Sequence, residues 1–219
     1  MIHATLLWLV SKDVWSFRLR LIPWISAYCR LGIRIMNFKI EVSGDREQIS
    51  QGPFLVASNH MSYLDILILS SKMPGCFVTS QEIREVPFLG HLCMLAGCLF
   101  VERRNKENIH NEIHELTEAL EKGLNVIFFP EATSTNGEQI LRFRKPLFQA
   151  AINSSQRVLP VCVNYISIDR IPITIQNRDL LCWYGDMAFA SHLWKLMLAK
   201  QVQVQIQVLE AILPQEESP

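Results

Sequence analysis

Short apolar runs alternate along most of this chain with longer stretches in which apolar residues recur every three or four positions. The strand-like runs lie at residues 38–43, 54–58, 76–79, 98–102, 125–129, 158–165 and 202–209. The helical patterns lie near residues 62–72, 87–95, 106–122, 146–154 and 187–200. This alternation predicts an α/β fold: a single domain with a mostly parallel central sheet flanked by helices.

The last strand-like run differs from the others. From residue 201 to 208, glutamine alternates strictly with valine or isoleucine. A period of two places all the glutamines on one face, so that face is expected to be solvated, as on an edge strand or an antiparallel strand.

The N-terminal segment combines apolar and basic residues at helical spacing. Its charged residues up to position 40 are Lys12, Arg18, Arg20, Arg30, Arg34 and Lys39 against Asp13 alone. Six basic residues minus one acidic residue give this segment a charge of +5. The net charge of the whole chain is zero, and this neutrality argues against a nucleic-acid partner. No run of eighteen uncharged residues occurs in the chain, and Pro23 interrupts the best candidate.

We therefore expect residues 1–37 to form amphipathic helices that lie on an anionic membrane surface, at its cytoplasmic face, as in a peripheral or monotopic protein. The alternative is that these helices simply pack on the domain, and both can hold if each helix face does one job. Residues 38–213 are the predicted catalytic domain, and residues 214–219 a short acidic tail. The six cysteines form no C-x-x-C pair, which favours reduced thiols in the cytosol.

Candidate chemistry lies between a strand-like run and a helical pattern, at Asn59-His60-Met61-Ser62-Tyr63-Leu64-Asp65. A histidine followed five residues later by a carboxylate can act as a general base whose second ring nitrogen is held by the acid. The same residues also permit a simpler interpretation. Ser62 and Asp65 have the spacing of a helix capping box, in which the acid only satisfies backbone donors.

A second signal favours the chemical interpretation. The apolar run from Leu124 to Phe129 stops at Pro130 and is followed by an acid and three hydroxyls, through Thr135. Ligand sites of α/β proteins gather at the carboxyl ends of strands, where both segments are expected.

Four blocks occur in order: N-H-x-x-x-x-D at residues 59–65, F-V-E-R-R at 100–104, F-P-E-A-T at 129–133 and V-L-P-V at 158–161. Together they resemble the PlsC-type glycerolipid acyltransferases. The resemblance implies that His60 deprotonates the acceptor alcohol and that Asp65 holds His60. It also implies substrate-binding roles, for the acceptor or for the shape of its site, at Asn59, Arg103, Arg104, Glu131, Thr133 and Arg144.

The function implied is acyl transfer from acyl-CoA or acyl carrier protein to a lysolipid, by default from 1-acylglycerol-3-phosphate to phosphatidic acid, at a membrane lipid surface. No cofactor is expected. No metal is expected either, because His110 and His114 lack the order of a zinc motif. The absence of a G-x-S-x-G sequence disfavours an acyl-serine mechanism. Neither the oligomeric state nor the choice of donor follows from the sequence.

The chain departs from the family pattern at three places. The usual E-G-T-R is Glu131-Ala132-Thr133-Ser134, a common lysine is replaced by Ser80, and the usual F-K-x-G is Phe143-Arg144-Lys145-Pro146. Loss of cations that would contact a phosphate leaves a second acceptor class open: another lysophospholipid or an amino-acid-containing lysolipid. A non-catalytic membrane-surface protein and a thioester hydrolase are the remaining alternatives.

Overall fold

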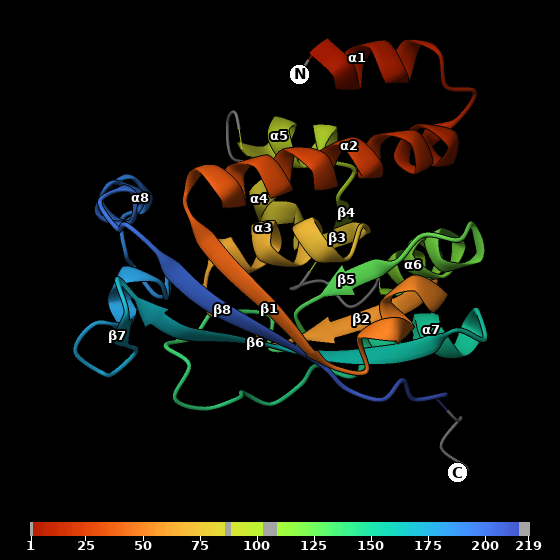
Figure 1. Ribbon diagram of the computed structural model, residues 1–219. Helices are drawn as coiled ribbons and strands as arrows, with labels where there is room; N and C mark the ends of the chain where they lie inside the picture. The colour runs from red at the N-terminus through yellow and green to blue at the C-terminus, as the bar shows by residue number, and fades with distance from the viewer. Residues whose placement is uncertain (1, 86–88, 103–108, 215–219) are drawn as a thin grey trace.

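The computed structural model describes residues 2–85, 89–102 and 109–214, which form a sheet covered by helices (Figure 1). The α-helices are α1 Ile2–Leu9, α2 Val14–Ile35, α3 Tyr63–Lys72, α4 Gln81–Glu85, α5 Leu89–Leu95, α6 Ile109–Glu121, α7 Gln149–Asn153 and α8 Phe189–Met197. Short 3-10 helices are η1 Arg46–Gln51, η3 Pro146–Phe148 and η4 Arg178–Leu180.

The strands form one sheet in the order β1-β8-β6-β2-β5-β3-β4, with β7 paired to β6. They are β1 Phe38–Gly44, β2 Phe54–Ser58, β3 Cys76–Ser80, β4 Leu99–Val101, β5 Val126–Phe128, β6 Arg157–Ile168, β7 Ile171–Pro172 and β8 Val202–Val208. The pairs β1/β8, β6/β2, β2/β5, β5/β3 and β3/β4 are parallel, whereas β8 and β7 run antiparallel to β6. The predicted mostly parallel sheet is confirmed.

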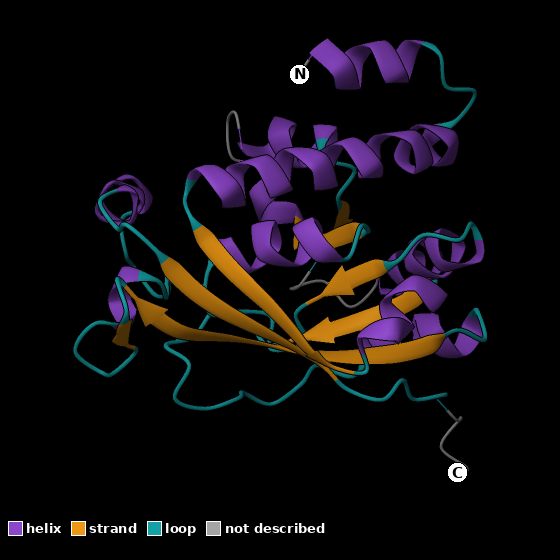
Figure 2. Ribbon diagram, in the orientation of Figure 1, coloured by secondary structure: helices purple, strands orange, loops and turns teal. Residues whose placement is uncertain are grey.

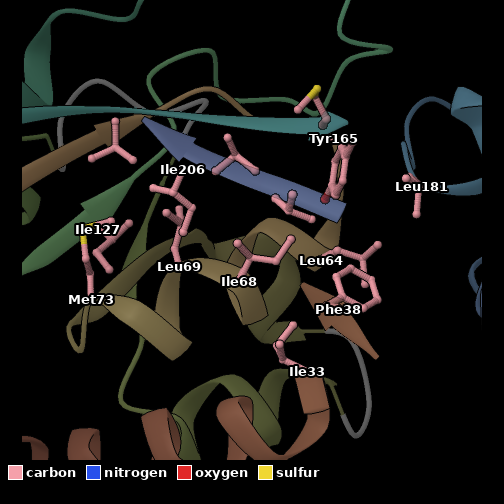
Figure 3. Close-up of a cluster of buried hydrophobic side chains, with 14 of the residues drawn as sticks. Ile33, Phe38, Leu64, Ile68, Leu69, Met73, Ile127, Tyr165, Leu181 and Ile206 are labelled. Carbon is pink, nitrogen blue, oxygen red and sulfur yellow. The ribbon is translucent and has the colours of Figure 1, made fainter. Parts of the chain in front are cut away.

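Helices cover the central strands on both faces (Figure 2). All five residues of β2 are buried, as expected for a parallel strand with both faces covered. One core packs α3 and the end of α2 against β1, β8, β6 and β2, and Figure 3 shows Ile33, Phe38 and Ile68 within it. A second core packs α6 and α7 against the opposite face.

Local signals in the sequence set the helix ends. Asp13 caps α2 by accepting hydrogen bonds from the backbone N–H groups of Trp15 and Ser16. Gly123, with a φ of +85°, follows α6 and allows the chain to turn there.

Helix α2 lies over the domain rather than apart from it. Arg18 is buried and donates hydrogen bonds to the carboxylate of Glu115 and the carbonyl oxygen of Cys98. The indole N–H of Trp15 donates to Glu118. Packing on the domain is therefore real, and it leaves another face of α2 exposed, with the apolar residues Leu19, Trp24, Tyr28, Leu31 and Ile35. No helix within the described ranges has the length and apolarity required to cross a bilayer.

The strand with alternating glutamines, β8, has one buried and one more exposed face. Its valines and isoleucine are buried, Gln203 and Gln207 are exposed, and the strand is antiparallel to β6. Of the two alternatives, an edge strand or an antiparallel strand, the second therefore holds, and β8 is not at the edge because β1 pairs with it along its full length. β1 itself occupies the edge of the sheet order.

The topology brings the two candidate segments together. Strands β2 and β5 are parallel neighbours, with Ala57 opposite Phe128. Their carboxyl ends therefore lie side by side, and the segments that begin at Asn59 and at Phe129 leave the sheet at the same edge.

Candidate active site

His60 lies in the short connection between β2 and α3, and its side chain is 19% exposed. Its Nδ1 lies 3.0 Å from Oδ2 of Asp65. A carboxylate at this distance accepts the Nδ1 proton, which leaves the lone pair of the neutral imidazole on Nε2. No hydrogen bond reaches Nε2 from the described part of the chain. The ring is thus oriented as a base, with Nε2 as the atom that can take a proton.

Asp65 is fully buried and accepts four hydrogen bonds. Oδ2 receives the backbone N–H groups of Met61 (2.7 Å) and Ser62 (2.8 Å) as well as Nδ1 of His60. Oδ1 receives the hydroxyl of Tyr165 at 2.6 Å. The predicted capping box is also present, with Ser62 as the N-cap of α3. One carboxylate therefore caps the helix and orients the histidine, so the two interpretations of this motif hold together.

Tyr165 was not among the predicted site residues. It extends from β6 into the core, and burial together with the negative charge of Asp65 raises the pKa of its hydroxyl well above the ordinary value. The hydroxyl therefore stays protonated and donates. The sequence held one signal for it: a tyrosine at the inward position of an alternating strand brings a polar group into an apolar core, where it needs a partner.

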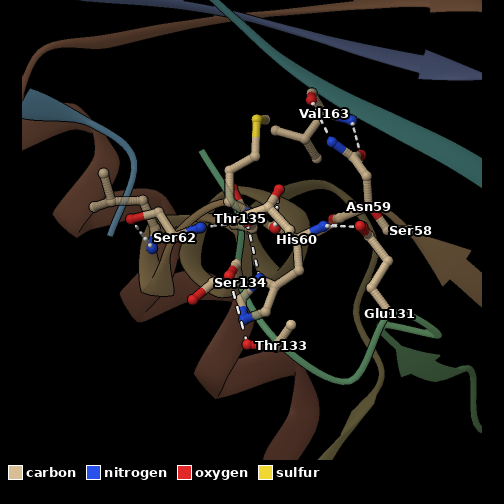
Figure 4. Close-up of polar contacts among 12 residues, drawn as sticks. Ser58, Asn59, His60, Ser62, Glu131, Thr133, Ser134, Thr135 and Val163 are labelled. Atoms are coloured by element: carbon tan, nitrogen blue, oxygen red, sulfur yellow. Dashed lines mark hydrogen bonds and ion pairs between the residues drawn. The ribbon is translucent and has the colours of Figure 1, made fainter. Parts of the chain in front are cut away.

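The segment after β5 also contacts His60, and Figure 4 shows Glu131 and residues 133–135 of this segment around it. The ring of Phe129 stacks on the imidazole, with centroids 3.9 Å apart and planes 10° apart. The backbone N–H of Thr135 donates to the carbonyl oxygen of His60 at 2.9 Å. Both the ring and the backbone of His60 are thus held by this segment.

Glu131 is buried, and both of its carboxylate oxygens are engaged by backbone. Oε1 accepts from the N–H of His60 at 3.1 Å, and Oε2 accepts from the N–H of Leu141 at 2.7 Å. The neighbouring Ala132 has a φ of +59°, in the left-handed region that favours glycine, which is the residue the family pattern has there. In this structure Glu131 links the backbone of His60 to the loop that follows β5.

The side chain of Asn59 is likewise hydrogen bonded to backbone groups. Its Nδ2 donates to the carbonyl oxygen of Val163 at 3.0 Å, and its Oδ1 accepts from the N–H of Val163 at 2.8 Å. This pair of bonds ties the start of the motif to β6. Contact of Asn59 or Glu131 with an acceptor remains a prediction.

The other predicted substrate-binding residues divide into two groups. Thr133 and Arg144 are exposed, and the backbone N–H of Arg144 donates to the carbonyl oxygen of Pro130 at 2.9 Å, so Arg144 lies beside the same loop. Arg103 and Arg104 lie outside the described residues, so their roles rest on the sequence alone.

An aromatic cluster adjoins the motif on its α3 side. The ring of Tyr63, the first residue of α3, makes edge-to-face contacts with Trp183, Phe189 and His192. The hydroxyl of Tyr63 lies 3.0 Å from Nδ1 of His192, and the backbone N–H of Trp183 donates to the carbonyl oxygen of Met61 at 2.8 Å. The C-terminal part of the chain therefore supports the position of the motif.

Comparison with known proteins shows which family the chain resembles. The family model described as Acyltransferase matches residues 39–164. A 1-acyl-sn-glycerol-3-phosphate acyltransferase of Neisseria gonorrhoeae is 34% identical over 152 residues, which are 69% of this chain and 57% of that protein. A lyso-ornithine lipid O-acyltransferase of Pseudomonas aeruginosa is 32% identical over 206 residues, 93% of this chain and 74% of that protein. The matched region thus spans little more than half the length of the Neisseria relative.

The fold is also similar to a solved structure. The crystal structure of the 1-acyl-sn-glycerophosphate acyltransferase PlsC from Thermotoga maritima superposes with a TM-score of 0.66 at 20% identity, covering 99% of this chain and 79% of that one. At this identity the similarity speaks for the fold alone. The sequence match to the family model covers more than half of the chain, and so the chain belongs to the Acyltransferase family.

Proposed function

We propose that this chain is a membrane-associated O-acyltransferase that moves a fatty acyl group from acyl-CoA or acyl carrier protein to the free hydroxyl of a lysolipid. The default acceptor is 1-acylglycerol-3-phosphate, and the product is then phosphatidic acid. The observation that supports this most is the 3.0 Å contact between Nδ1 of His60 and Oδ2 of Asp65, with Nε2 left to act as the base. Family membership and the names of the relatives point to the same reaction class.

In the proposed reaction, Nε2 of His60 takes the proton of the acceptor hydroxyl as its oxygen attacks the carbonyl carbon of the thioester. The new C–O bond gives a tetrahedral intermediate. Collapse of the intermediate breaks the C–S bond, and the departing thiolate takes the proton from His60. Asp65 keeps its charge and stabilises the imidazolium that forms between the two steps.

The surrounding residues hold this geometry in the proposal. Phe129 covers one face of the imidazole, Asn59 fixes the start of the motif on β6, and Glu131 fixes the backbone of His60. Thr133 and Arg144 lie exposed on the loop beside the base, where an acceptor head group can reach them. Arg103 and Arg104 supply the phosphate contact that the family resemblance implies.

The test is free-thiol release from acyl-CoA by purified protein in mixed micelles, with and without 1-acylglycerol-3-phosphate. We expect release that depends on the acceptor and is lost in His60→Ala. The matched control is His114→Ala, which removes an exposed histidine of α6. Release without an acceptor would indicate a hydrolase instead, and no release with any lysolipid or with acyl carrier protein donors would favour a non-catalytic membrane-surface protein.

A second acceptor class has specific support. The Pseudomonas relative named a lyso-ornithine lipid O-acyltransferase aligns with 93% of this chain. Ser134 stands where the family pattern has an arginine. An ornithine head group carries an amine and a carboxylate, so it needs fewer cations than a phosphate monoester. Competition between 1-acylglycerol-3-phosphate and the lyso-ornithine lipid in one assay tests which acceptor is preferred. A higher kcat/KM for 1-acylglycerol-3-phosphate would rule out the ornithine lipid as the preferred acceptor.

The proposed location is the cytoplasmic face of a membrane, in peripheral or monotopic contact. The exposed apolar stripe of α2 supports it, since basic residues such as Arg20 and Arg34 also lie exposed on this helix. Sedimentation with vesicles that contain phosphatidylglycerol, compared with phosphatidylcholine alone, tests this proposal.

A further inference from the structure

Helix α8 turns an apolar face to the solvent. It buries His192 and Leu196 against the domain. Trp194 is 66% exposed, Met197 63% and Leu198, its C-cap, 68%. Residues three and four positions apart lie on one face of a helix, so these three side chains form one continuous apolar surface. We call Trp194, Met197 and Leu198 the α8 face.

Two lysines flank the α8 face. Lys195 and Lys200 are both exposed, and residues 187–200 contain no aspartate or glutamate. A tryptophan with aliphatic neighbours and flanking lysines is typical of a helix that lies at the boundary between lipid head groups and acyl chains. Lysines beside the apolar surface also complement the negative charge of an anionic leaflet.

The end of α8 lies near the end of α2. Nδ2 of Asn37 donates to the carbonyl oxygen of Lys200 at 2.7 Å, and the backbone N–H of Val202 donates to the carbonyl oxygen of Asn37 at 3.3 Å. These bonds join the segments that follow the two helices, and Figure 1 shows α8 on the side of the domain where α2 leads into β1. Ile35, two residues before Asn37, is 75% exposed. Apolar side chains of both helices therefore lie around one junction.

The inward face of α8 reaches the proposed catalytic motif. The ring of Phe189 lies 4.9 Å, centroid to centroid, from that of Tyr63, and His192 is hydrogen bonded to the Tyr63 hydroxyl. Tyr63 is only three residues from His60. The position of α8 is thus mechanically linked to the start of α3, where the base is held.

We propose that α8 is a membrane-docking helix whose Trp194, Met197 and Leu198 enter the surface of an anionic bilayer, with Lys195 and Lys200 at the level of the lipid phosphates. Resting on the proposed function, the contact through Tyr63 then holds His60 near the surface that supplies the lysolipid. The occupant is a bilayer rather than a second copy of the chain, because lysines flank the apolar surface and α2 presents further exposed apolar and basic residues.

The test uses the full chain and vesicles of phosphatidylcholine with phosphatidylglycerol. A variant carrying Trp194→Gln, Met197→Gln and Leu198→Gln should bind these vesicles about tenfold or more weakly than the wild type. The matched control carries Ile140→Gln and Ile212→Gln, which change exposed isoleucines outside α8, and should bind like the wild type. An unchanged midpoint of thermal unfolding confirms that both variants are folded.

Charge reversal provides a second, independent test. Lys195→Glu with Lys200→Glu should weaken binding to the anionic vesicles and leave the weaker binding to pure phosphatidylcholine unchanged. Wild-type vesicle affinity in both variants would overturn the proposal. So would light scattering that shows a wild-type dimer and a monomeric glutamine variant, because the α8 face would then be an interface between copies.

Vesicle binding needs no turnover, so its outcome is separate from that of the proposed reaction. If the protein is an acyltransferase, the glutamine variant should keep its rate on a short-chain lysolipid dispersed as monomers and lose rate on an acceptor embedded in vesicles. Equal loss on both acceptors would contradict a docking role for α8.

Discussion

The Tyr165 hydroxyl donates a 2.6 Å hydrogen bond to Oδ1 of Asp65, on the opposite carboxylate oxygen from the one that holds His60. These residues are one hundred positions apart in the chain. The bond fixes the plane of the carboxylate, so β6 contributes to the orientation of the imidazole without touching it.

Tyr165→Phe removes this donor and leaves Oδ1 buried without it. A hydrogen bond to a charged group contributes about 1.5–3 kcal/mol, so we expect kcat to fall about tenfold or more with little change in KM. Steady-state kinetics measure kcat and KM separately. Tyr184→Phe, which removes an exposed hydroxyl bonded to Asp179, is the control. A wild-type kcat in Tyr165→Phe would mean that the other three donors suffice to hold Asp65.

Glu131→Gln tests the link between His60 and the loop after β5. The amide places an NH₂ group against one of the two backbone N–H donors, at His60 or at Leu141. We expect a loss of about 1–3 kcal/mol in the free energy of unfolding, together with lower activity. Denaturant unfolding measures the stability, and Glu210→Gln at an exposed position is the control. Unchanged stability would contradict a structural role for this carboxylate.

His192 predicts a pH dependence of stability. Burial lowers its pKa below the ordinary value of 6.5, with a smaller contribution from Lys195. The unfolded chain then binds the proton more readily than the folded chain, so the contribution of His192 to stability is complete above about pH 6.5 and is lost as the pH falls below it. The midpoint of thermal unfolding falls as the pH is lowered, and this fall should be smaller in His192→Gln than in the wild type. Parallel pH curves for the two proteins would refute this.

The cysteines should differ in reactivity. A hydrogen bond with the Cys98 thiol lowers the pKa of Cys93, whereas burial raises the pKa of Cys76 and Cys182 to about 12. In native protein near neutral pH, iodoacetamide should alkylate Cys93 first, and Cys76 and Cys182 only after unfolding. Peptide mass spectrometry over time measures the order. Cys98→Ala should slow the reaction of Cys93, and an equal rate at Cys162 would contradict the prediction.

Much of the fold followed from the sequence because its signals are local. Hydrophobic period and run length distinguish strands from helices, and their alternation implies parallel strands. It was therefore possible to expect that His60 and Glu131, each directly after a strand, would meet at one edge of the sheet. Their hydrogen-bond contact, Oε1 of Glu131 to the His60 N–H, agrees with this expectation.

Sheet order did not follow, because pairing between distant strands leaves no local signal. Alternation from Gln201 onward correctly indicated one wet face, but it could not show that β1 would cover the free edge of β8. The same reason applies to Tyr165: its direction is readable from its strand, while the identity of its partner depends on where α3 starts in space.

The site residues show a related limit. Asp65 could be assigned to the histidine or to the helix cap, and the segment after residue 129 favoured the histidine. That both roles hold at once was not expected, although a carboxylate has lone pairs enough for both. Asn59 and Glu131 were grouped with the substrate contacts because they lie in the motifs. Their backbone hydrogen bonds are features of the folded chain that residue type alone does not reveal.

The parallel pairing of β1 with β8 joins residues 38–44 to residues 202–208. During synthesis, β1 emerges from the ribosome long before its partner, and β6 likewise waits for β8 on one side. Pairing of the sheet is therefore incomplete until residues 202–208 have been made. We expect nascent chains that end before β8 to expose strand edges and apolar surface, and so to depend on chaperones until β8 has been made.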